Sequence, residues 1–292
     1  FWLKLRLKSS SRRLDSDPSS SFHPHHQTFG MPPTVAMAGL ATGASPTTAF
    51  PCDHLNLPPR TPSWSRSVSS SPLEELMQAV SEEDWARNFE EGLTTICMRA
   101  DWSAKPERCD FLKVVAASSQ AKRVLEIGSF CGAAALALAD ALPEGQVHAI
   151  EIDPFVVKFG ERFRNKSMCG RQITTHVGPA MEKLQTLAQE VRAGKLEPFD
   201  FVVVDADKAG MRAYFDVLWD SGLLSERAVV CVDLTPFKGQ PPLRYVKYGF
   251  PYTWEAESGR KEIDDLKAHV AAAQRFASHE AGQLLVVQRA RY

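Results

Sequence analysis

Residues 199–208 read Phe-Asp-Phe-Val-Val-Val-Asp-Ala-Asp-Lys, an apolar run that ends abruptly in two carboxylates and one amine. Such a run of β-branched residues is typical of a strand that is buried on both faces of a sheet. Asp205 and Lys208 should therefore emerge at the carboxyl end of that strand, where open α/β sheets bind ligands. A second strand, predicted over 228–232, ends in Asp233. We expect Asp205 and Asp233 to converge on one site, the alternative being two solvated strand ends.

Strands and helices alternate along the rest of the chain. Strands are expected at 123–127, 146–152, 173–177, 199–205, 228–232 and 284–288, and helices at 133–141, 154–164, 179–193, 209–218 and 262–274. Repeated β-α units require right-handed crossovers and therefore a parallel sheet with helices on both faces. The sequence thus predicts an α/β fold with a doubly wound, mostly parallel sheet, whose last strand runs antiparallel at an edge.

The first 70 residues differ in composition from the rest. Ten of the nineteen prolines lie within residues 1–72, together with serine clusters, so residues 1–70 are predicted to be a disordered tail. Residues 1–14 carry five basic and no acidic residues, which leaves an organelle-targeting segment open, with Met31 as an alternative start. One domain is expected over 71–292. It opens with helices near 71–80, 82–98 and 106–117 that cover a ligand or pack against a second subunit in a homodimer.

Composition narrows the class of partner. Lysine and arginine total 34 against 35 acidic residues, so no strong field favours nucleic acid or a membrane surface, and a small molecule is the expected partner. No apolar run approaches the roughly 18 residues of a membrane span. The six cysteines form no C-x-x-C pair, which favours reduced thiols and a cytoplasmic location.

The turn after the first predicted strand indicates which ligand to expect. Gly128 and Gly132 follow a G-x-x-x-G spacing rather than the G-x-G-x-x-G of dinucleotide folds. Glu126 at the strand end would compete with a phosphate for the helix terminus, so a cationic ligand is favoured over a pyrophosphate. Glu151 ends the next strand, where a carboxylate accepts hydrogen bonds from a ribose diol unless it is merely solvated.

Five segments occur in the same order as in a known class of enzymes. They are 125–128, Glu151, 178–180, 204–208 and 232–235 with Gly239. From about residue 85 onward the chain resembles the caffeoyl-CoA and catechol class of S-adenosylmethionine-dependent O-methyltransferases, which implies a Rossmann-like methyltransferase sheet. Segments 151–154, 177–181 and 231–241 most resemble the methyltransferases of mycosporine-like amino acid synthesis, which form 4-deoxygadusol by methylating a cyclic enediol-like precursor.

The resemblance assigns roles to individual residues. It implies that Lys208 is the general base, which requires a depressed pKa, and that Asp205 assists it. The alternative for Lys208 is a helix-start lysine paired with Asp207. Asp205 and Asp233 resemble carboxylates that hold a divalent cation such as Mg²⁺ against two adjacent acceptor oxygens. The cofactor is implied to contact Glu126, Gly128, Phe130, Gly132, Glu151, Gly178, Pro179, Ala180 and Asp205, although the aromatic ring of Phe130 could equally serve packing.

One position departs from the class. The third metal ligand would be an asparagine directly after Asp233, and this chain has Leu234 there. Leucine offers no oxygen to a hard cation. Two carboxylates with waters could bind the metal weakly, or the chain could rely on Lys208 alone, and we predict weaker or absent metal dependence.

The predicted function is methyl transfer from S-adenosylmethionine to a hydroxyl of a small vicinal-diol, enediol or catechol-like acceptor. One alternative is a phenolic methyltransferase of the caffeoyl-CoA or catechol type, and another is a non-catalytic protein that binds S-adenosylmethionine. A nicotinamide-dependent dehydrogenase would share the sheet but needs the G-x-G-x-x-G turn, which this sequence does not place after its first strand.

Overall fold

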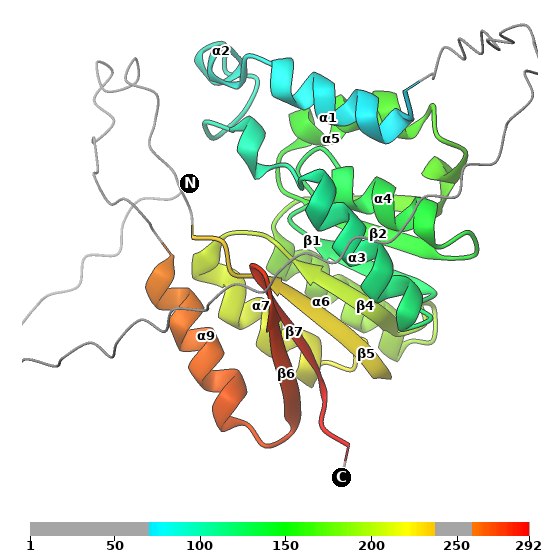
Figure 1. Cartoon of the computed structure of the whole chain (residues 1–292), viewed down its shortest axis with the longest axis vertical. Helices are drawn as coiled ribbons and strands as arrows, with labels where there is room; N and C mark the ends of the chain where they lie inside the picture. The colour runs from blue at the N-terminus through cyan, green and yellow to red at the C-terminus, as the bar shows by residue number, and fades with distance from the viewer. Residues whose placement is uncertain (1–69, 237–258, 292) are drawn as a thin grey trace, which may run out of the picture. The chain divides into compact units, whose positions relative to one another are not determined.

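A seven-stranded sheet forms the centre of the computed structural model, which describes residues 70–236 and 259–291 (Figure 1). Its strands are β1 Arg123–Ile127, β2 Gln146–Glu151, β3 Ile173–Val177, β4 Phe199–Val204, β5 Leu224–Asp233, β6 Phe276–Ala281 and β7 Leu284–Arg289. The order across the sheet is β3-β2-β1-β4-β5-β7-β6. The first five strands are parallel, β7 is antiparallel to β5, and β6 is antiparallel to β7. The predicted doubly wound, mostly parallel α/β sheet is confirmed.

Helices cover both faces of this sheet. They are α1 Pro72–Glu82, α2 Trp85–Glu90, α3 Pro106–Ser118, α4 Ala133–Ala141, α5 Pro154–Arg164, α6 Ala180–Arg192, α7 Lys208–Asp220 and α9 Arg260–Ala272, with short 3₁₀ turns at Ala100–Trp102 and Met168–Gln172. In β4, Val202 and Val204 pack with residues of α6, α7 and α9. Phe201 and Val203 point to the opposite face and pack with α3 and α4. Successive residues of β4 point to opposite faces of the sheet, and both faces are buried. Residues 201–204 must therefore all be apolar.

The centre of the sheet determines where a ligand can bind. β1 and β4 are neighbours at the centre of the sheet. β2 and β3 follow outward from β1, and β5 and β7 follow outward from β4, so the strand order reverses its direction between β1 and β4. Open α/β sheets bind ligands at the carboxyl ends of the strands beside such a reversal. Glu126 in β1 and Asp205 just after β4 lie at that point.

The N-terminal helices form a cover over α4 and α5. Helix α1 begins with a capping box, in which Ser71 and Glu74 each accept a hydrogen bond from the other's backbone amide. Its buried residues join Trp85 and the aromatic side chains of α5 in a separate apolar cluster. The predicted helix over 82–98 is wrong in extent, because α2 spans six residues and Gly92 follows it at φ 73°.

The C-terminal part of the sheet differs from the prediction in one strand. β7 is the predicted closing strand, but it lies between β5 and β6 rather than at the edge. The edge is β6, whose sequence Phe-Ala-Ser-His-Glu-Ala gave no apolar pattern because its four central residues are exposed. The antiparallel edge was therefore expected, while the strand that forms it was missed.

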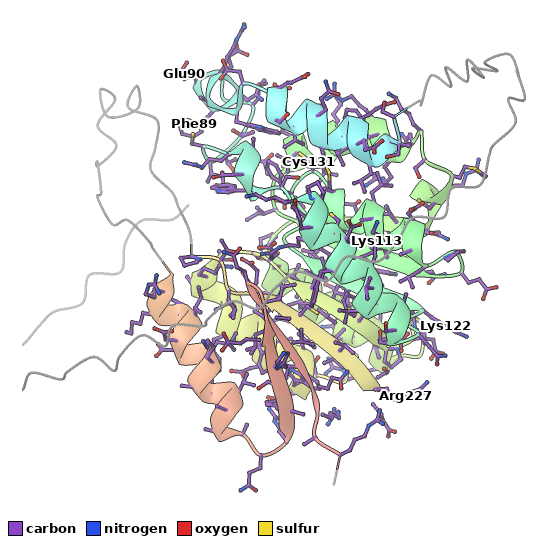
Figure 2. All side chains as sticks on the ribbon, in the orientation of Figure 1. Phe89, Glu90, Lys113, Lys122, Cys131 and Arg227 are labelled. Carbon is purple, nitrogen blue, oxygen red and sulfur yellow. The ribbon has the colours of Figure 1, made fainter. Side chains whose placement is uncertain are left out.

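Some expectations concern residues outside the described ranges. The tail predicted over 1–70 lies there except for its last residue, as does Gly239. Among the described residues, no helix is long and apolar enough to cross a membrane. The five described cysteines are free, and Cys131 lies buried inside the fold while Lys122 and Arg227 extend from its surface (Figure 2).

Candidate active site

A cavity of about 1050 Å³ opens at the carboxyl ends of the central strands. It brings together most of the residues that the sequence singled out, namely Gly128, Phe130, Glu151, Gly178, Pro179, Ala180, Asp205, Lys208 and Asp233. Glu126, Gly132 and Leu234 are not among the residues that line it. A cavity of this size is large enough for a nucleoside-sized ligand together with a small second molecule.

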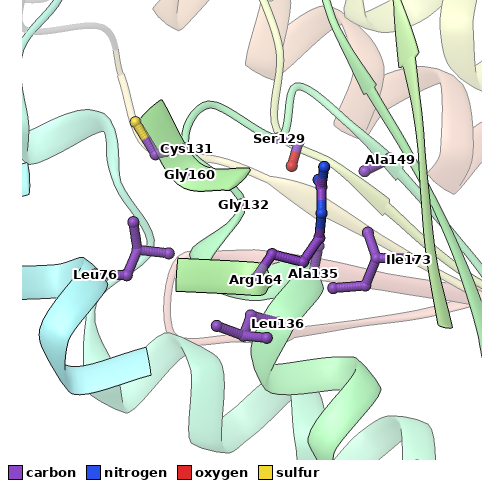
Figure 3. A pocket seen from close by; sticks show the side chains of 10 residues that line it. All are labelled: Leu76, Ser129, Cys131, Gly132, Ala135, Leu136, Ala149, Gly160, Arg164 and Ile173. Atoms are coloured by element: carbon purple, nitrogen blue, oxygen red, sulfur yellow. The ribbon is translucent and has the colours of Figure 1, made fainter. Parts of the chain in front are cut away.

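Gly132 lies beside a different and much smaller space. It adopts φ 84° at the N-cap of α4, a conformation that favours glycine. It lines a cavity of about 10 Å³ together with Cys131 and Arg164 (Figure 3). That volume holds at most about one water molecule. Gly132 therefore shapes the turn into α4, and in this structure it does not face the large cavity.

Gly128 allows two strands to approach each other closely. It adopts φ 85°, and the space that a Cβ would take is filled by the backbone of Asp205 and Ala206. The Asp205 amide also donates to the Ile127 carbonyl over 2.8 Å. Gly128 lines the large cavity, but the neighbour at its missing side chain is the end of β4. The contact brings Asp205 next to the turn that follows β1.

The carboxylate of Glu151 is held by three backbone amides. Its Oε2 accepts from Phe130 over 2.7 Å, and its Oε1 accepts from Ile152 over 2.8 Å and Asp153 over 3.1 Å. Burial raises the pKa of Glu151, and these hydrogen bonds oppose the shift. A carboxylate has about four acceptor sites, so roughly one remains for a ligand in the cavity.

Phe130 holds an uncommon backbone conformation beside this carboxylate. Its φ is 50°, in the left-handed region that costs a bulky residue free energy. The hydrogen bond to Glu151 holds the backbone there. The ring of Phe130 packs on Trp85 at 5.1 Å between centroids, and Phe130 also lines the cavity. The ring can therefore pack in the core and contact a ligand at the same time.

Glu126 is a buried carboxylate with an unpaired oxygen. Its Oε2 has no hydrogen-bond partner among the described residues, and the residue is 3% exposed. Burial raises the pKa of Glu126 to about 8; the charges of Asp205 and Glu151 add to the shift, and the Ser129 hydroxyl opposes it. An unpaired buried carboxylate is costly unless a cation or a proton compensates it.

Lys208 and Asp233 form a buried ion pair. The Nζ of Lys208 donates to Asp233 Oδ2 over 2.7 Å and to the Asp233 carbonyl over 3.0 Å. The two side chains are 6% and 4% exposed. Asp207 instead caps α7, accepting from the Gly210 amide and the Tyr214 hydroxyl over 2.6 Å each. The alternative pairing of Lys208 with Asp207 is therefore wrong.

Arg108 in the first turn of α3 completes this group, and the sequence did not indicate it. Its Nη1 lies 2.5 Å from Asp233 Oδ1 and 3.5 Å from Asp205 Oδ2. Its Nη2 donates to the Thr235 hydroxyl over 3.1 Å. No local pattern marks Arg108, because its partners lie 97 residues or more away along the chain.

The pKa values of Asp205 and Asp233 shift in opposite directions in this environment. Burial raises the pKa of Asp205 to about 7, the charge of Asp233 adds to the shift, and Arg108 and Lys208 oppose it. For Asp233, burial is outweighed by Lys208 and Arg108, which hold its pKa below the usual range together with the Thr235 hydroxyl. Asp233 is therefore the firmly ionised carboxylate of the group.

These residues do not fit a divalent cation. The amide of Leu234 donates to the Gln283 carbonyl over 2.8 Å, and its side chain packs against the apolar core. No group of three acidic, histidine or cysteine side chains suited to a metal occurs in the described part of the chain. Both aspartates already contact the Arg108 guanidinium. Hard cations such as Mg²⁺ bind through carboxylates and waters, and here the carboxylates that would hold one are already paired with cationic side chains.

Comparisons with known proteins agree with the fold and indicate a family. The family model described as O-methyltransferase matches residues 82–240. The chain is 39% identical over 111 residues to catechol O-methyltransferase domain-containing protein 1 of Mus musculus, covering 38% of this chain and 41% of that protein. It is 41% identical over 100 residues to tricin synthase 1 of Oryza sativa subsp. japonica, covering 34% of this chain and 40% of that protein. The alignments thus span less than half the length of these two relatives.

Solved structures share the fold. The O-methyltransferase TomG from Streptomyces achromogenes, in complex with S-adenosylmethionine, superimposes with a TM-score of 0.56 at 23% identity, over 76% of this chain and 90% of that one. Because the family model matches more than half of the sequence, the chain belongs to the O-methyltransferase family.

Proposed function

We propose that this protein is an S-adenosylmethionine-dependent O-methyltransferase that acts on a small acceptor with two adjacent oxygens. One observation carries the proposal. A single cavity is lined both by Glu151, at the end of β2, and by the Lys208, Asp205 and Asp233 group, at the ends of β4 and β5. Membership of the O-methyltransferase family supports the reaction type.

The chain's own residues fit the methyl donor. Glu151, positioned by three amides, keeps about one acceptor site for a ribose hydroxyl. Glu126 does not line the cavity, but it lies at the end of β1 beside it, and its unpaired buried oxygen favours a proton or a cation nearby. When bound, S-adenosylmethionine supplies a methyl group on a sulfonium, so that an S–C bond breaks as the new C–O bond forms.

The other side of the cavity prepares the acceptor oxygen. In its neutral form the Lys208 amine takes the proton of the reacting hydroxyl, which leaves an oxyanion as the nucleophile. Asp233 holds that amine at the cavity wall through two hydrogen bonds. Gly259 at φ 88° closes over the lysine stem, because a Cβ there would lie 2.6 Å from Lys208 Cγ. The amine is thus fixed in one direction, which in-line transfer requires.

The acceptor class rests on resemblance and on the names of relatives. Catechol-like and cyclic enediol acceptors, including the precursor of 4-deoxygadusol, present two adjacent oxygens of the kind proposed here. We take residues 71–292 as the catalytic domain. We also propose a reducing, cytoplasm-like compartment, on the support of five free and mostly buried or half-buried thiols.

The test combines ligand binding with turnover. Calorimetric titration with S-adenosylmethionine should give saturable binding, whereas NAD should give none. Methyl transfer is then measured on catechol, caffeoyl-CoA and desmethyl-4-deoxygadusol, and at least one acceptor should be methylated. Binding without turnover on any acceptor with adjacent oxygens would favour the non-catalytic alternative. Absence of S-adenosylmethionine binding would overturn the proposal altogether.

A further inference from the structure

Arg108 joins three elements at the floor of the cavity. It extends from α3 to Asp205 after β4, to Asp233 at the end of β5 and to Thr235 beyond it. Its side chain is 15% exposed, and Arg108 lines the cavity. A guanidinium so placed faces both the protein carboxylates and any ligand that enters.

The guanidinium occupies the place where a cation would bind. Asp205 and Asp233 are the carboxylates that resemble metal ligands, and the same nitrogen, Nη1 of Arg108, contacts both. A divalent cation would have to lie within about 2.0–2.6 Å of both carboxylates. It cannot share that space with an arginine nitrogen.

The charges of the group also balance without a metal. Asp205 and Asp233 contribute two negative charges when ionised, and Arg108 and Lys208 contribute two positive ones. Each oxygen of Asp233 has its own cation, since Arg108 binds Oδ1 and Lys208 binds Oδ2. An added divalent ion would therefore meet a group that is already neutralised.

Arg108 retains donors for a ligand. A guanidinium carries five N–H donors in a planar fork, and that fork matches paired oxygens in a bidentate manner. The contacts within the described residues are two from Nη1 and one from Nη2. Adjacent acceptor oxygens, one of them an oxyanion, are the kind of ligand that such a fork recognises.

We propose that Arg108 takes the place of the divalent cation, its guanidinium holding the two adjacent oxygens of the acceptor while the methyl group is transferred. The inference rests on the proposed function, because it concerns the acceptor side of the same cavity. It makes Arg108 a catalytic residue that stabilises the negative charge developing on the acceptor, as preorganised donors do in other active sites.

The first experiment compares the wild type with Arg108→Gln and Arg108→Lys. Wild-type kcat/KM on a vicinal diol should be unchanged by chelator, and Arg108→Gln should lower it by about 10²–10³-fold. Arg108→Lys should restore only part of the loss, because lysine keeps the charge without the fork. Binding of S-adenosylmethionine should stay near wild type, whereas Arg108→Gln should unfold at a lower temperature, because buried Asp233 loses one of its two cations. Arg212→Gln, which breaks an exposed ion pair with Asp216 on α7, is the matched control and should retain full activity.

A comparison of acceptors separates ligand recognition from structural support. The loss in Arg108→Gln should be much larger for a vicinal diol than for the matching single hydroxyl, since only the diol uses both arms of the fork. Equal losses on both acceptors would overturn the proposal. So would a wild-type activity that disappears in chelator and returns with Mg²⁺. If the wild type methylates nothing, the proposed function fails first, which distinguishes the two failures.

A binding measurement without turnover completes the test. Mn²⁺ binding is followed by electron paramagnetic resonance in the wild type and in Arg108→Ala. The wild type should bind no Mn²⁺, whereas Arg108→Ala should bind it, because the guanidinium no longer contacts the two carboxylates and leaves them to the metal ion and its waters. Tight Mn²⁺ binding by the wild type would contradict the inference.

Discussion

Asp233 is the residue through which the two cations of the site act together. Lys208 and Arg108 each bind one of its carboxylate oxygens, and the Thr235 hydroxyl donates to it as well. Because Asp233 is 3% exposed, its charge depends on these partners rather than on water. The position of the Lys208 amine therefore depends on Asp233 as much as on its own helix.

The role of Lys208 is tested by two substitutions. Lys208→Met should lower kcat on the diol acceptor by about 10²–10⁴-fold, the usual contribution of a positioned acid or base. Lys208→Arg should be equally impaired, because a guanidinium remains protonated and takes no proton. Steady-state kinetics over a range of pH measures both effects.

The control for Lys208 lies on α3. Lys113 pairs with Asp110 over 2.7 Å and does not line the cavity (Figure 2). Lys113→Met should keep wild-type kinetics. An active Lys208→Arg variant would indicate that positive charge, and not proton transfer, is what this position provides.

Sequence reasoning found the acidic residues of the site and Lys208 but not Arg108. Asp205, Asp233 and Glu151 each follow or end an apolar strand, so their place at one edge of the sheet follows from the parallel topology. Arg108 follows a helix-start proline and resembles any solvated arginine of a first turn. Only the three-dimensional packing of α3 against the sheet brings it to the carboxylates, and no single-sequence pattern encodes that.

The turn between β1 and α4 is the element that joins the two sides of the cavity. Gly128 meets the Asp205 backbone, and Phe130 donates to Glu151. The proposed cofactor site and the proposed acceptor site are thus connected through residues 128–130. A change in this turn should affect both binding sites at once.

Two glycine substitutions separate the cost of an unfavourable backbone conformation from the cost of a steric clash. Gly128→Ala should unfold at markedly lower denaturant concentration and weaken binding of S-adenosylmethionine, because it adds a steric conflict with Asp205 to an unfavourable φ. Gly222→Ala has φ 83° and nothing within 4 Å of the added carbon, so it should cost only about 1–2 kcal/mol of the free energy of unfolding. Urea unfolding and calorimetry measure the two effects. Equal destabilisation of both variants would contradict the packing argument.

Strands and helices were predictable from the sequence where their pattern of apolar residues was strong. The central strands β1, β4 and β5 are mostly apolar over their predicted ranges, and each was located within a few residues of its observed position. β6 was missed because an exposed edge strand needs no apolar residues, and its pairing with β7 comes from backbone hydrogen bonds. The overlong helix at 82–98 shows the opposite error, since periodicity continued past the glycine that ends α2.

At the scale of the whole molecule, Glu126 couples stability to pH. Its pKa is about 8 in the folded protein against 4.5 in the unfolded chain, so the folded state retains a proton that the unfolded state has lost. Unfolding then releases a proton, and the free energy of unfolding falls as pH rises from about 4.5 to 8. Glu126→Gln should flatten this decline in the ligand-free protein.

The measurement is urea unfolding at pH values from 5 to 9. Glu144→Gln, at an exposed position in the loop after α4, serves as the control and should leave the pH dependence unchanged. If Glu126→Gln kept the pH dependence of the wild type, the assignment of Glu126 as a buried carboxylate with a raised pKa would be contradicted.

The same network bears on how the protein would depend on its chemical surroundings. A metal ion exchanges with the medium, and catechols and enediols can themselves chelate it. Arg108 is part of the chain, so every molecule carries its positive charge whatever the concentration of divalent ions. An acceptor that chelates metals could not remove it. A methyltransferase with such an arginine would keep working in metal-poor conditions and at high concentrations of a chelating acceptor.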